Sequence, residues 1–230
     1  MLEDLKNRFD FFVRNKTRFS RKNFVEKNRE LVERNMLENE YTKDILSKAF
    51  TKRELREAKI LDIGCKNWFY AKGEYDFFKS FCKKISLDGV EIDAFRLYSN
   101  FYSRYEVAKY YTKELVGTNY ICDNLLNIKD RYDYIVWFLP FVLIEPHLCW
   151  GLPKKCFYPK KLLEHAYSLL NNDAEMLIVN QGEAEADTQK ALLDELNIPY
   201  KFLGELKSEK FEYKNKRFGF LVTKVCNQNS

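Results

Sequence analysis

Two short apolar runs each deliver a residue suited to binding a nucleoside. The first run, 58–63, is followed by Gly64, and the second, 87–92, carries Glu91 near its end. Glycine has no Cβ, so a ligand can approach the backbone closely at that point. A carboxylate at the end of a neighbouring strand can accept hydrogen bonds from both hydroxyls of a ribose. We therefore predict that Gly64 and Glu91 bind an adenosine-containing molecule.

The pattern of apolar residues around these two runs predicts an open α/β sheet. Five strand-like runs alternate with helix-like segments, which is typical of a parallel sheet with helical crossovers. Two further β-rich runs, 200–206 and 218–225, have no room for a helix between them and should pair antiparallel. The expected strands are 59–63, 87–92, 120–122, 134–138 and 176–179, and the expected helices are 75–84, 95–114, 159–170 and 184–196. The sequence thus predicts a Rossmann-like seven-stranded mixed sheet with a C-terminal antiparallel hairpin.

The first quarter of the chain is expected to be an N-terminal helical extension. Residues 1–57 contain neither Gly nor Pro, and Leu37, Tyr41, Ile45 and Ala49 recur at helical spacing. We predict two or three helices here, followed by a Rossmann-like domain at 58–230.

The net charge of the chain is concentrated in the same quarter. Residues 1–59 carry 16 Lys/Arg and 11 Asp/Glu, which accounts for the whole excess of +5. Basic residues alternate with phenylalanines between Lys6 and Arg29. This pattern is typical of RNA binding, and equally of a helix with a phenylalanine face toward the core. We favour the second interpretation and keep RNA as a partner that the basic helices could bind.

Three motifs in this framework resemble the class I S-adenosylmethionine-dependent methyltransferases. Leu61-Asp62-Ile63-Gly64 resembles the glycine-loop motif, Glu91 matches the ribose-binding acid, and Asp123 matches the acid that contacts adenine. The resemblance covers residues 58–226 and implies S-adenosylmethionine as cofactor and methyl transfer as activity. Segments 66–68 and 137–141 are also similar to those of a bacterial subfamily. The cofactor-binding residues that the resemblance implies are Asp62, Gly64, Lys66, Glu91, Asp123 and Asn124.

The loop after the first strand departs from the family pattern Gly-x-Gly-x-Gly, because Gly64-Cys65-Lys66-Asn67-Trp68 keeps the first glycine alone. Asn67 tolerates a positive φ, and Lys66 would pair with the cofactor's carboxylate, unless it is a solvated loop lysine. We expect Asp62 to hold the loop through backbone N–H groups, since an unpaired carboxylate inside a strand is costly. Asn124 is an alternative to Asp123 for the adenine contact.

The segment after the fourth strand, 137–153, is long and apolar, so we expect a lid or pocket wall. Its titratable residues His147 and Glu145 are the predicted acid–base groups, with a structural role for His147 as the alternative. The predicted substrate-binding residues are Trp137, Trp150, Gln181 and Glu183. The last two could instead simply begin a helix. We expect no metal site, because His147, Cys149 and Cys156 match no paired-ligand spacing.

The composition indicates a soluble cytoplasmic protein of 230 residues with no membrane partner. No run of about 18 apolar residues is present, and the first residues lack the layout of a signal peptide. The six cysteines form no CxxC pair and are expected to be free and mostly buried. The leading hypothesis is a methyltransferase whose acceptor is a small molecule or RNA. The alternative, suggested by the missing loop glycines, is a non-catalytic Rossmann-like binding or scaffold protein.

Overall fold

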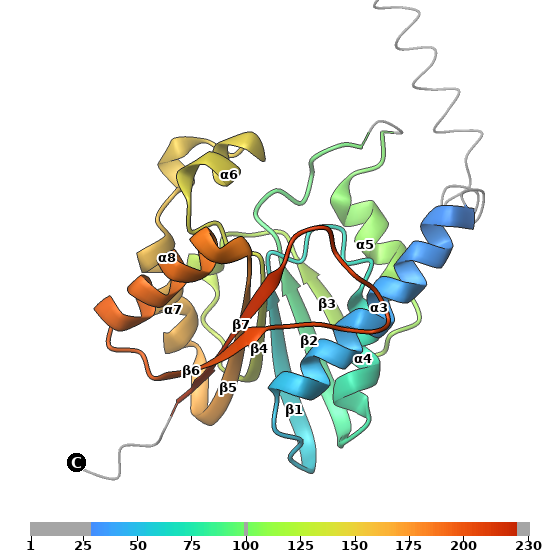
Figure 1. Cartoon of the computed structure of the whole chain (residues 1–230). Coiled ribbons are helices and arrows are strands. Elements are labelled where there is room, and N and C mark those ends of the chain that lie inside the picture. Colours follow the sequence, from blue (N-terminus) through green and yellow to red (C-terminus); the bar gives the residue numbers. More distant parts are fainter. Residues whose placement is uncertain (1–28, 99–100, 225–230) are drawn as a thin grey trace, which may run out of the picture.

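The computed structural model of the chain describes residues 29–98 and 101–224, and a seven-stranded sheet forms its centre (Figure 1). The strands are β1 (Leu55–Ile63), β2 (Cys82–Val90), β3 (Thr118–Ile121), β4 (Tyr132–Phe138), β5 (Leu170–Gln181), β6 (Tyr200–Glu205) and β7 (Arg217–Thr223). Their order is β3-β2-β1-β4-β5-β7-β6. Strands β1 to β5 pair in parallel, and β7 is antiparallel to both β5 and β6. The predicted mixed sheet with its closing hairpin is confirmed.

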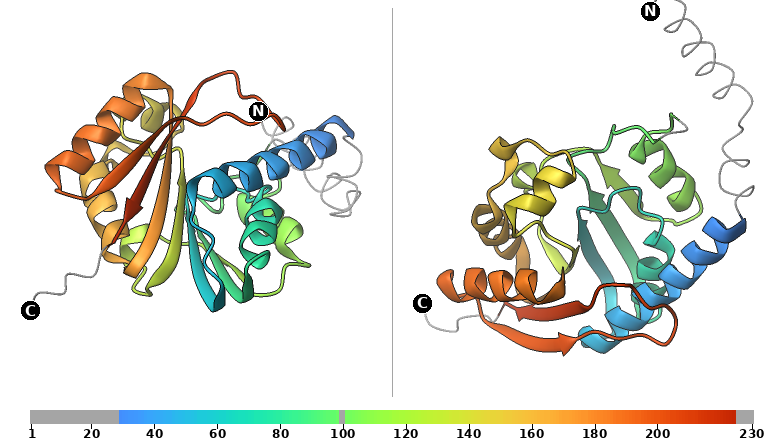
Figure 2. Two further views of the ribbon diagram at one scale, coloured as in Figure 1. Left: turned by 60° about the horizontal axis from the view of Figure 1, so that its bottom comes forward. Right: turned by 45° about the horizontal axis from the view of Figure 1, so that its top comes forward.

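Helices cover both faces of this sheet (Figures 1 and 2). One face carries α3 (Arg29–Ala49), α4 (Ala71–Lys79) and α5 (Arg104–Thr112), and the other carries α7 (Pro159–Ser168) and α8 (Gly182–Glu195). The short helix α6 (Ile144–Cys149) lies above the carboxyl ends of the strands, followed by the 3-10 turn η2 (Lys154–Cys156). A second 3-10 turn, η1 (Leu125–Asn127), follows β3.

Each face of the sheet has its own apolar core, because side chains alternate between faces along a strand. In β1, Ala58 and Ile60 pack toward α3 and α4, whereas Leu61 and Ile63 pack toward α7 and α8. Full burial of an isoleucine or leucine side chain contributes roughly 1.5–3 kcal/mol. Burial on both faces therefore stabilises the sheet whose strand ends are followed by Gly64 and Glu91.

Two predicted helices have the wrong bounds. The helix expected at 75–84 is α4, Ala71–Lys79, because Cys82 already pairs with Leu55 at the start of β2. The helix expected at 95–114 is α5, which begins only at Arg104. A capping box explains that start, since the Ser103 side chain accepts from the N–H of Glu106 and the Glu106 carboxylate accepts from the N–H of Ser103.

Helix α3 confirms part of the expected N-terminal helical structure. Tyr41, Ile45 and Ala49 are buried as expected, but Leu37 is 47% exposed, so its place on that face is a wrong prediction. Strand β1 begins at Leu55, within the segment assigned to the extension. The basic segment from Lys6 to Arg29 lies almost wholly outside the described residues, and the proposed division of the chain into two parts stays a prediction.

Five cysteines are described, and all five are free thiols. Cys65 and Cys82 are buried, but Cys122 and Cys149 are exposed and Cys156 is half-buried, so the expectation of mostly buried thiols is wrong. In the described part of the chain, no helix is both long and apolar enough to cross a bilayer.

Candidate active site

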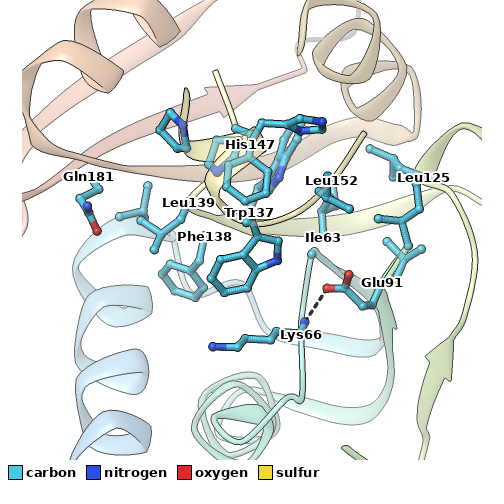
Figure 3. A pocket seen from close by; sticks show the side chains of 18 of the residues that line it. Ile63, Lys66, Glu91, Leu125, Trp137, Phe138, Leu139, His147, Leu152 and Gln181 are labelled. Carbon is cyan, nitrogen blue, oxygen red and sulfur yellow. Dashed lines mark hydrogen bonds between the residues drawn. The ribbon is translucent and has the colours of Figure 1, made fainter. Parts of the chain in front are cut away.

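A cavity of about 870 Å³ opens at the carboxyl ends of the strands. Its wall combines the ends of β1, β2, β4 and β5 with residues of α3 and of the segment from Phe138 to Pro159 (Figure 3). Small-molecule sites in proteins occupy roughly 300–1,000 Å³ and prefer this edge of an open α/β sheet. The cavity is therefore large enough for a nucleoside cofactor together with a second molecule.

The turn after β1 forms one wall of the cavity. Gly64 has a φ of +73° and donates its N–H to the carbonyl of Val90 at 2.8 Å. A Cβ at Gly64 would meet no protein atom within 4 Å, so the space above it is open. Lys66 and Trp68 also have positive φ, of 55° and 47°. The expected positive φ at Asn67 is wrong, because its two neighbours take that conformation.

Buried contacts below the turn hold these strained residues in place. The Trp68 ring is fully buried, and its Nε1–H donates to Oε2 of Glu74 at 2.9 Å. The Tyr120 hydroxyl donates to the carbonyl of Lys66. A Cβ at Gly89 would lie 2.9 Å from both Cys65 Sγ and the Trp68 ring, so Gly89 is required for this packing. The turn is thus preformed without the family's second and third glycines.

Asp62 lies beneath the turn and does not line the cavity. Its Oδ2 accepts from the Tyr70 hydroxyl at 2.9 Å, whereas Oδ1 is buried without a hydrogen-bond partner. The expected bonds to backbone N–H groups are therefore replaced by a side-chain bond. Burial raises the pKa of Asp62 well above its usual value, and the Tyr70 bond opposes the shift; burial likewise raises the pKa of Glu74. Asp62 supports the site indirectly, through Tyr70, which does line it.

Glu91 faces the cavity from the tip of β2 and is itself tightly held. Oε2 accepts from the backbone N–H of Lys66 at 2.9 Å, the bond drawn in Figure 3, and Oε1 accepts from the N–H of Asp93 at 2.8 Å. The guanidinium of Arg104 lies 3.5 Å from Oε1. An ionised carboxylate has about four acceptor sites, so Glu91 retains acceptor capacity for a ligand.

The segment from Phe138 to Pro159 forms a lid on the cavity. Trp150, at the end of α6, is the lid residue that covers this part of it. Lys66 Nζ lies 4.9 Å and the Arg104 guanidinium 5.0 Å from the centre of its ring. The Arg96 side chain also donates to the Trp150 carbonyl. Three cationic side chains thus contact Trp150: Lys66 from the turn after β1, Arg96 from the segment after β2, and Arg104 from the start of α5.

The two predicted acid–base groups are not brought together. His147 is buried and lines the cavity, and its Nε2 lies 3.0 Å from the carbonyl of Pro153. Its ring packs edge-on against Phe141 and Phe157. Glu145, on the same helix, is exposed and does not line the cavity. A carbonyl accepts only from an N–H, so Nε2 is protonated and Nδ1 is the ring atom left for other contacts.

Asp123 and Asn124 both line the cavity after β3, and both are engaged in local structure. Oδ1 of Asp123 accepts from the backbone of Asn124 and from Asn127. The Asn124 side chain caps η1 through the N–H of Leu126 and donates to the Tyr158 hydroxyl at 2.8 Å. Asn124 therefore ties the β3 end to the lid, while the Asp123 side chain stays exposed.

Three of the four predicted substrate-binding residues line the cavity, and the fourth does not. Trp137 and Trp150 line the cavity, and Figure 3 shows Trp137 beside Phe138 among the lining side chains. Gln181 also lines it, at the end of β5, and accepts from Arg217 at 2.6 Å. Glu183 is exposed, lies outside the lining, and is 3.4 Å from Lys216.

Several lining residues were not found by sequence reasoning. They include four residues at the opposite end of the cavity: Glu38, Tyr41, Tyr213 and Arg217. Sequence reasoning also missed Arg104, which does not line the cavity but whose guanidinium contacts Trp150. Figure 1 shows the segment between β6 and β7 running beside α3, and both supply residues that line the cavity although they are far apart in the sequence. No motif marks such residues. The helical spacing of Tyr41 indicated burial, but not what it is buried against.

Comparison with protein-family models and with curated protein sequences gives no match. Solved structures do match. A SAM-dependent methyltransferase from Aquifex aeolicus is similar over 93% of this chain and 98% of its own, with a TM-score of 0.56 and 12% identity. The plantazolicin methyltransferase BpumL, in complex with SAH, is similar over 93% of this chain and 94% of its own, with a TM-score of 0.50 and 17% identity. The N-methyltransferase NodS from Bradyrhizobium japonicum WM9 is similar over 83% of this chain and 98% of its own, with a TM-score of 0.52 and 14% identity. At such identities the likeness shows a shared fold.

Proposed function

We propose that this chain, which has the fold of the class I S-adenosylmethionine-dependent methyltransferases, transfers a methyl group from S-adenosylmethionine to an acceptor held in the same cavity. The observation that carries the proposal is that Gly64 and Glu91 face one cavity, with open space above the glycine. We further propose a cytoplasmic enzyme of bacterial type, following the resemblance of segments 66–68 and 137–141.

The residues present fit the cofactor. Glu91 would accept the ribose hydroxyls, and Lys66 would pair with the carboxylate of the methionine part. Asn67 lines the cavity, and its buried Oδ1 has no hydrogen-bond partner, so we propose that it accepts from the cofactor's ammonium group. Asp123 and Asn124 stand at the β3 end, where adenine would lie. Trp150 would cover the nucleoside from the lid side.

The bound cofactor supplies an electrophilic methyl group on a positively charged sulfur, and the sulfur keeps the electron pair of the broken bond. The chain's own contribution is then mainly to position the acceptor in line and to exclude water, which lowers the barrier by restricting motion. His147 lines the cavity, so Nδ1 of this residue is the group that we propose accepts a proton where the acceptor must lose one. The catalytic role of Glu145 and the substrate-binding role of Glu183 stay predictions. The exposed positions of both residues do not support these roles.

The alternative is a non-catalytic protein with the same fold. A cavity filled by aromatic rings would favour that alternative. Trp68 instead packs below the turn, against Gly89 and Tyr120, and does not line the cavity. Phe69 does line it, but a volume of about 870 Å³ stays open beside its ring. The space above Gly64 is open. The geometry therefore supports a site that receives a cofactor, despite the missing glycines.

An RNA acceptor is a second form of the same proposal, suggested by the basic segment between Lys6 and Arg29. Its test is binding of total RNA to the full chain over a range of salt concentrations. Phosphate contacts would make the affinity fall steeply with salt, and removal of residues 1–28 should abolish it. A flat salt dependence would leave the small-molecule acceptor.

The direct test of the cofactor assignment is calorimetry with S-adenosylhomocysteine. We expect binding by the wild-type chain and a loss of roughly 1–3 kcal/mol in Glu91→Ala, because a buried hydrogen-bond partner is removed. Glu40→Ala, an exposed substitution on α3, is the control and should bind normally. Folded wild-type protein that binds no S-adenosylhomocysteine at millimolar concentration rules out the proposal.

A further inference from the structure

The cavity has a second polar end, built around Arg217. This residue opens β7 and pairs across the sheet with Gln181, the last residue of β5. Nη1 of Arg217 donates to Oε1 of Gln181 at 2.6 Å, and its guanidinium lies 4.6 Å from the centre of the Tyr213 ring. Both Arg217 and Tyr213 line the cavity. The guanidinium is thus held in one place by a hydrogen bond and a ring.

No carboxylate in the described part of the chain comes within ion-pair distance of Arg217. The two acidic residues whose charge acts on it are bound elsewhere: Glu38 pairs with Arg34 at 2.7 Å, and Glu185 accepts from the N–H of Gln181 at 2.8 Å. Burial lowers the pKa of Arg217, which reflects its loss of water. Arg217 is half-buried, so its charge has lost part of its hydration, and pairing with a counter-ion would offset that cost.

An independent hydrogen-bonding group faces the same end of the cavity. The Tyr41 side chain is 5% exposed, its hydroxyl has no hydrogen-bond partner, and its ring packs edge-on against Tyr213 at 4.9 Å. Burial raises the pKa of Tyr41 to about 12, so the hydroxyl stays protonated at neutral pH and can donate. A fixed guanidinium and an unused hydroxyl donor together match the two oxygens of a carboxylate.

The position of Arg217 separates it from the nucleoside end. Neighbouring strands in a sheet are about 4.8 Å apart, so β7, which Arg217 opens, lies three strands, on the order of 14 Å, from β1, which Gly64 follows. Glu91 follows β2, which is one strand further away. The carboxylate of the cofactor has a nearer cation in Lys66, on the β1 turn itself. An anion that pairs with Arg217 would therefore belong to the second molecule in the cavity.

We infer that the methyl acceptor carries a carboxylate group that binds to Arg217 and Tyr41 at the end of the cavity between α3 and β7. This inference rests on the proposed methyltransferase function. It names the acceptor class as an organic acid, and it assigns the walls of its site to aromatic residues: Tyr41, Tyr70, Phe138 and Tyr213.

The test is calorimetry on protein saturated with S-adenosylhomocysteine, using pairs of aromatic acids and their neutral amides. The probes are benzoate with benzamide, phenylacetate with phenylacetamide, and nicotinate with nicotinamide. We expect at least one acid to bind ten-fold or more tightly than its amide. Arg217→Met should abolish this preference, and Arg217→Lys should keep part of it. Tyr41→Phe should lower the affinity for the acid several-fold. Arg131→Met, an exposed arginine bonded to the Ser168 carbonyl, is the control.

Two sets of results overturn the inference while leaving the methyltransferase proposal in place. In the first, no acid binds better than its amide, or the preference survives in Arg217→Met. In the second, Arg217→Met loses affinity for S-adenosylhomocysteine itself, which would mean that Arg217 holds the cofactor's carboxylate. Wild-type protein that does not bind S-adenosylhomocysteine removes the proposed function instead, so the two failures are distinguishable.

Discussion

Nη1 of Arg104 lies 3.5 Å from Oε1 of Glu91 and 3.2 Å from Oδ2 of Asp93, so one buried guanidinium bridges two carboxylates at the tip of β2. The Arg104 and Glu91 side chains are only 3% and 8% exposed. Glu91 also bonds to the N–H of Lys66. Arg104 therefore fixes the carboxylate that would bind ribose, and it connects that carboxylate to Trp150 in the lid.

Removal of Arg104 should leave a buried carboxylate without its cation. We expect Arg104→Met to lower the free energy of unfolding by about 3 kcal/mol. The double variant Arg104→Met/Glu91→Gln should recover part of this loss, because the uncompensated charge is gone. Urea unfolding of the four proteins in this cycle measures the coupling. Strictly additive losses would show that the ion pair has no energetic role.

Gly64 and Gly182 form a matched pair for testing close approach of a ligand. Both have a φ of +73°, and a Cβ at either meets no protein atom within 4 Å. Gly64→Ala and Gly182→Ala should each cost about 1 kcal/mol of stability, from the left-handed backbone. Only Gly64→Ala should also weaken S-adenosylhomocysteine binding, by ten-fold or more, since its methyl group enters the cofactor's space. Equal affinity of the two variants would place the ligand elsewhere.

Trp150 should slow the departure of the cofactor. Two cations lie within 5.0 Å of its ring, and such contacts contribute roughly 0.5–1 kcal/mol each. We expect Trp150→Ala to speed S-adenosylhomocysteine dissociation several-fold in stopped-flow measurements, and Trp150→Phe to have a smaller effect. Leu148→Ala, an exposed change on the same helix, is the control. An unchanged rate in Trp150→Ala would mean that the lid does not hold the ligand.

The buried carboxyls beneath the β1 turn should make stability depend on pH. Burial raises the pKa of Glu74 well above its usual value, with the charge of Asp62 acting in the same direction. The folded state then keeps a proton that the unfolded state releases above the ordinary glutamate pKa of 4.5. This contribution to stability is therefore present at low pH and is lost as the pH rises toward the folded-state pKa.

Glu74→Gln removes this titration while leaving an oxygen to accept from Trp68. We expect the stability of Glu74→Gln relative to wild type to increase between pH 5 and pH 8, as measured by urea unfolding. Glu40→Gln, on the exposed side of α3, should show no such trend. A parallel pH dependence in wild type and Glu74→Gln would contradict the assignment.

The sequence by itself determined the sheet, because strand signals are local. Apolar runs such as 58–63 alternate with helix-forming segments, and the short connection before β7 leaves no room for a crossover helix, so an antiparallel hairpin follows. It also located Gly64 and Glu91, since residues directly after parallel strands always meet at one edge of the sheet. Helix bounds were less well determined. The start of α5 depends on the Ser103–Glu106 box, and the end of α4 depends on β2 pairing with β1.

The tertiary structure alone decided what surrounds those two residues. Helix α3 and the segment before β7 are separated by more than 150 residues in sequence, yet Tyr41 and Tyr213 meet with ring centres 4.9 Å apart. Arg104 reaches Glu91 because of how α5 packs, and Glu145 points to solvent because α6 turns His147 inward. Sequence spacing specifies which face of an element a side chain occupies. Which element covers that face is set by packing over the whole chain, and here packing converts two strand ends into a cavity with a second, cationic end.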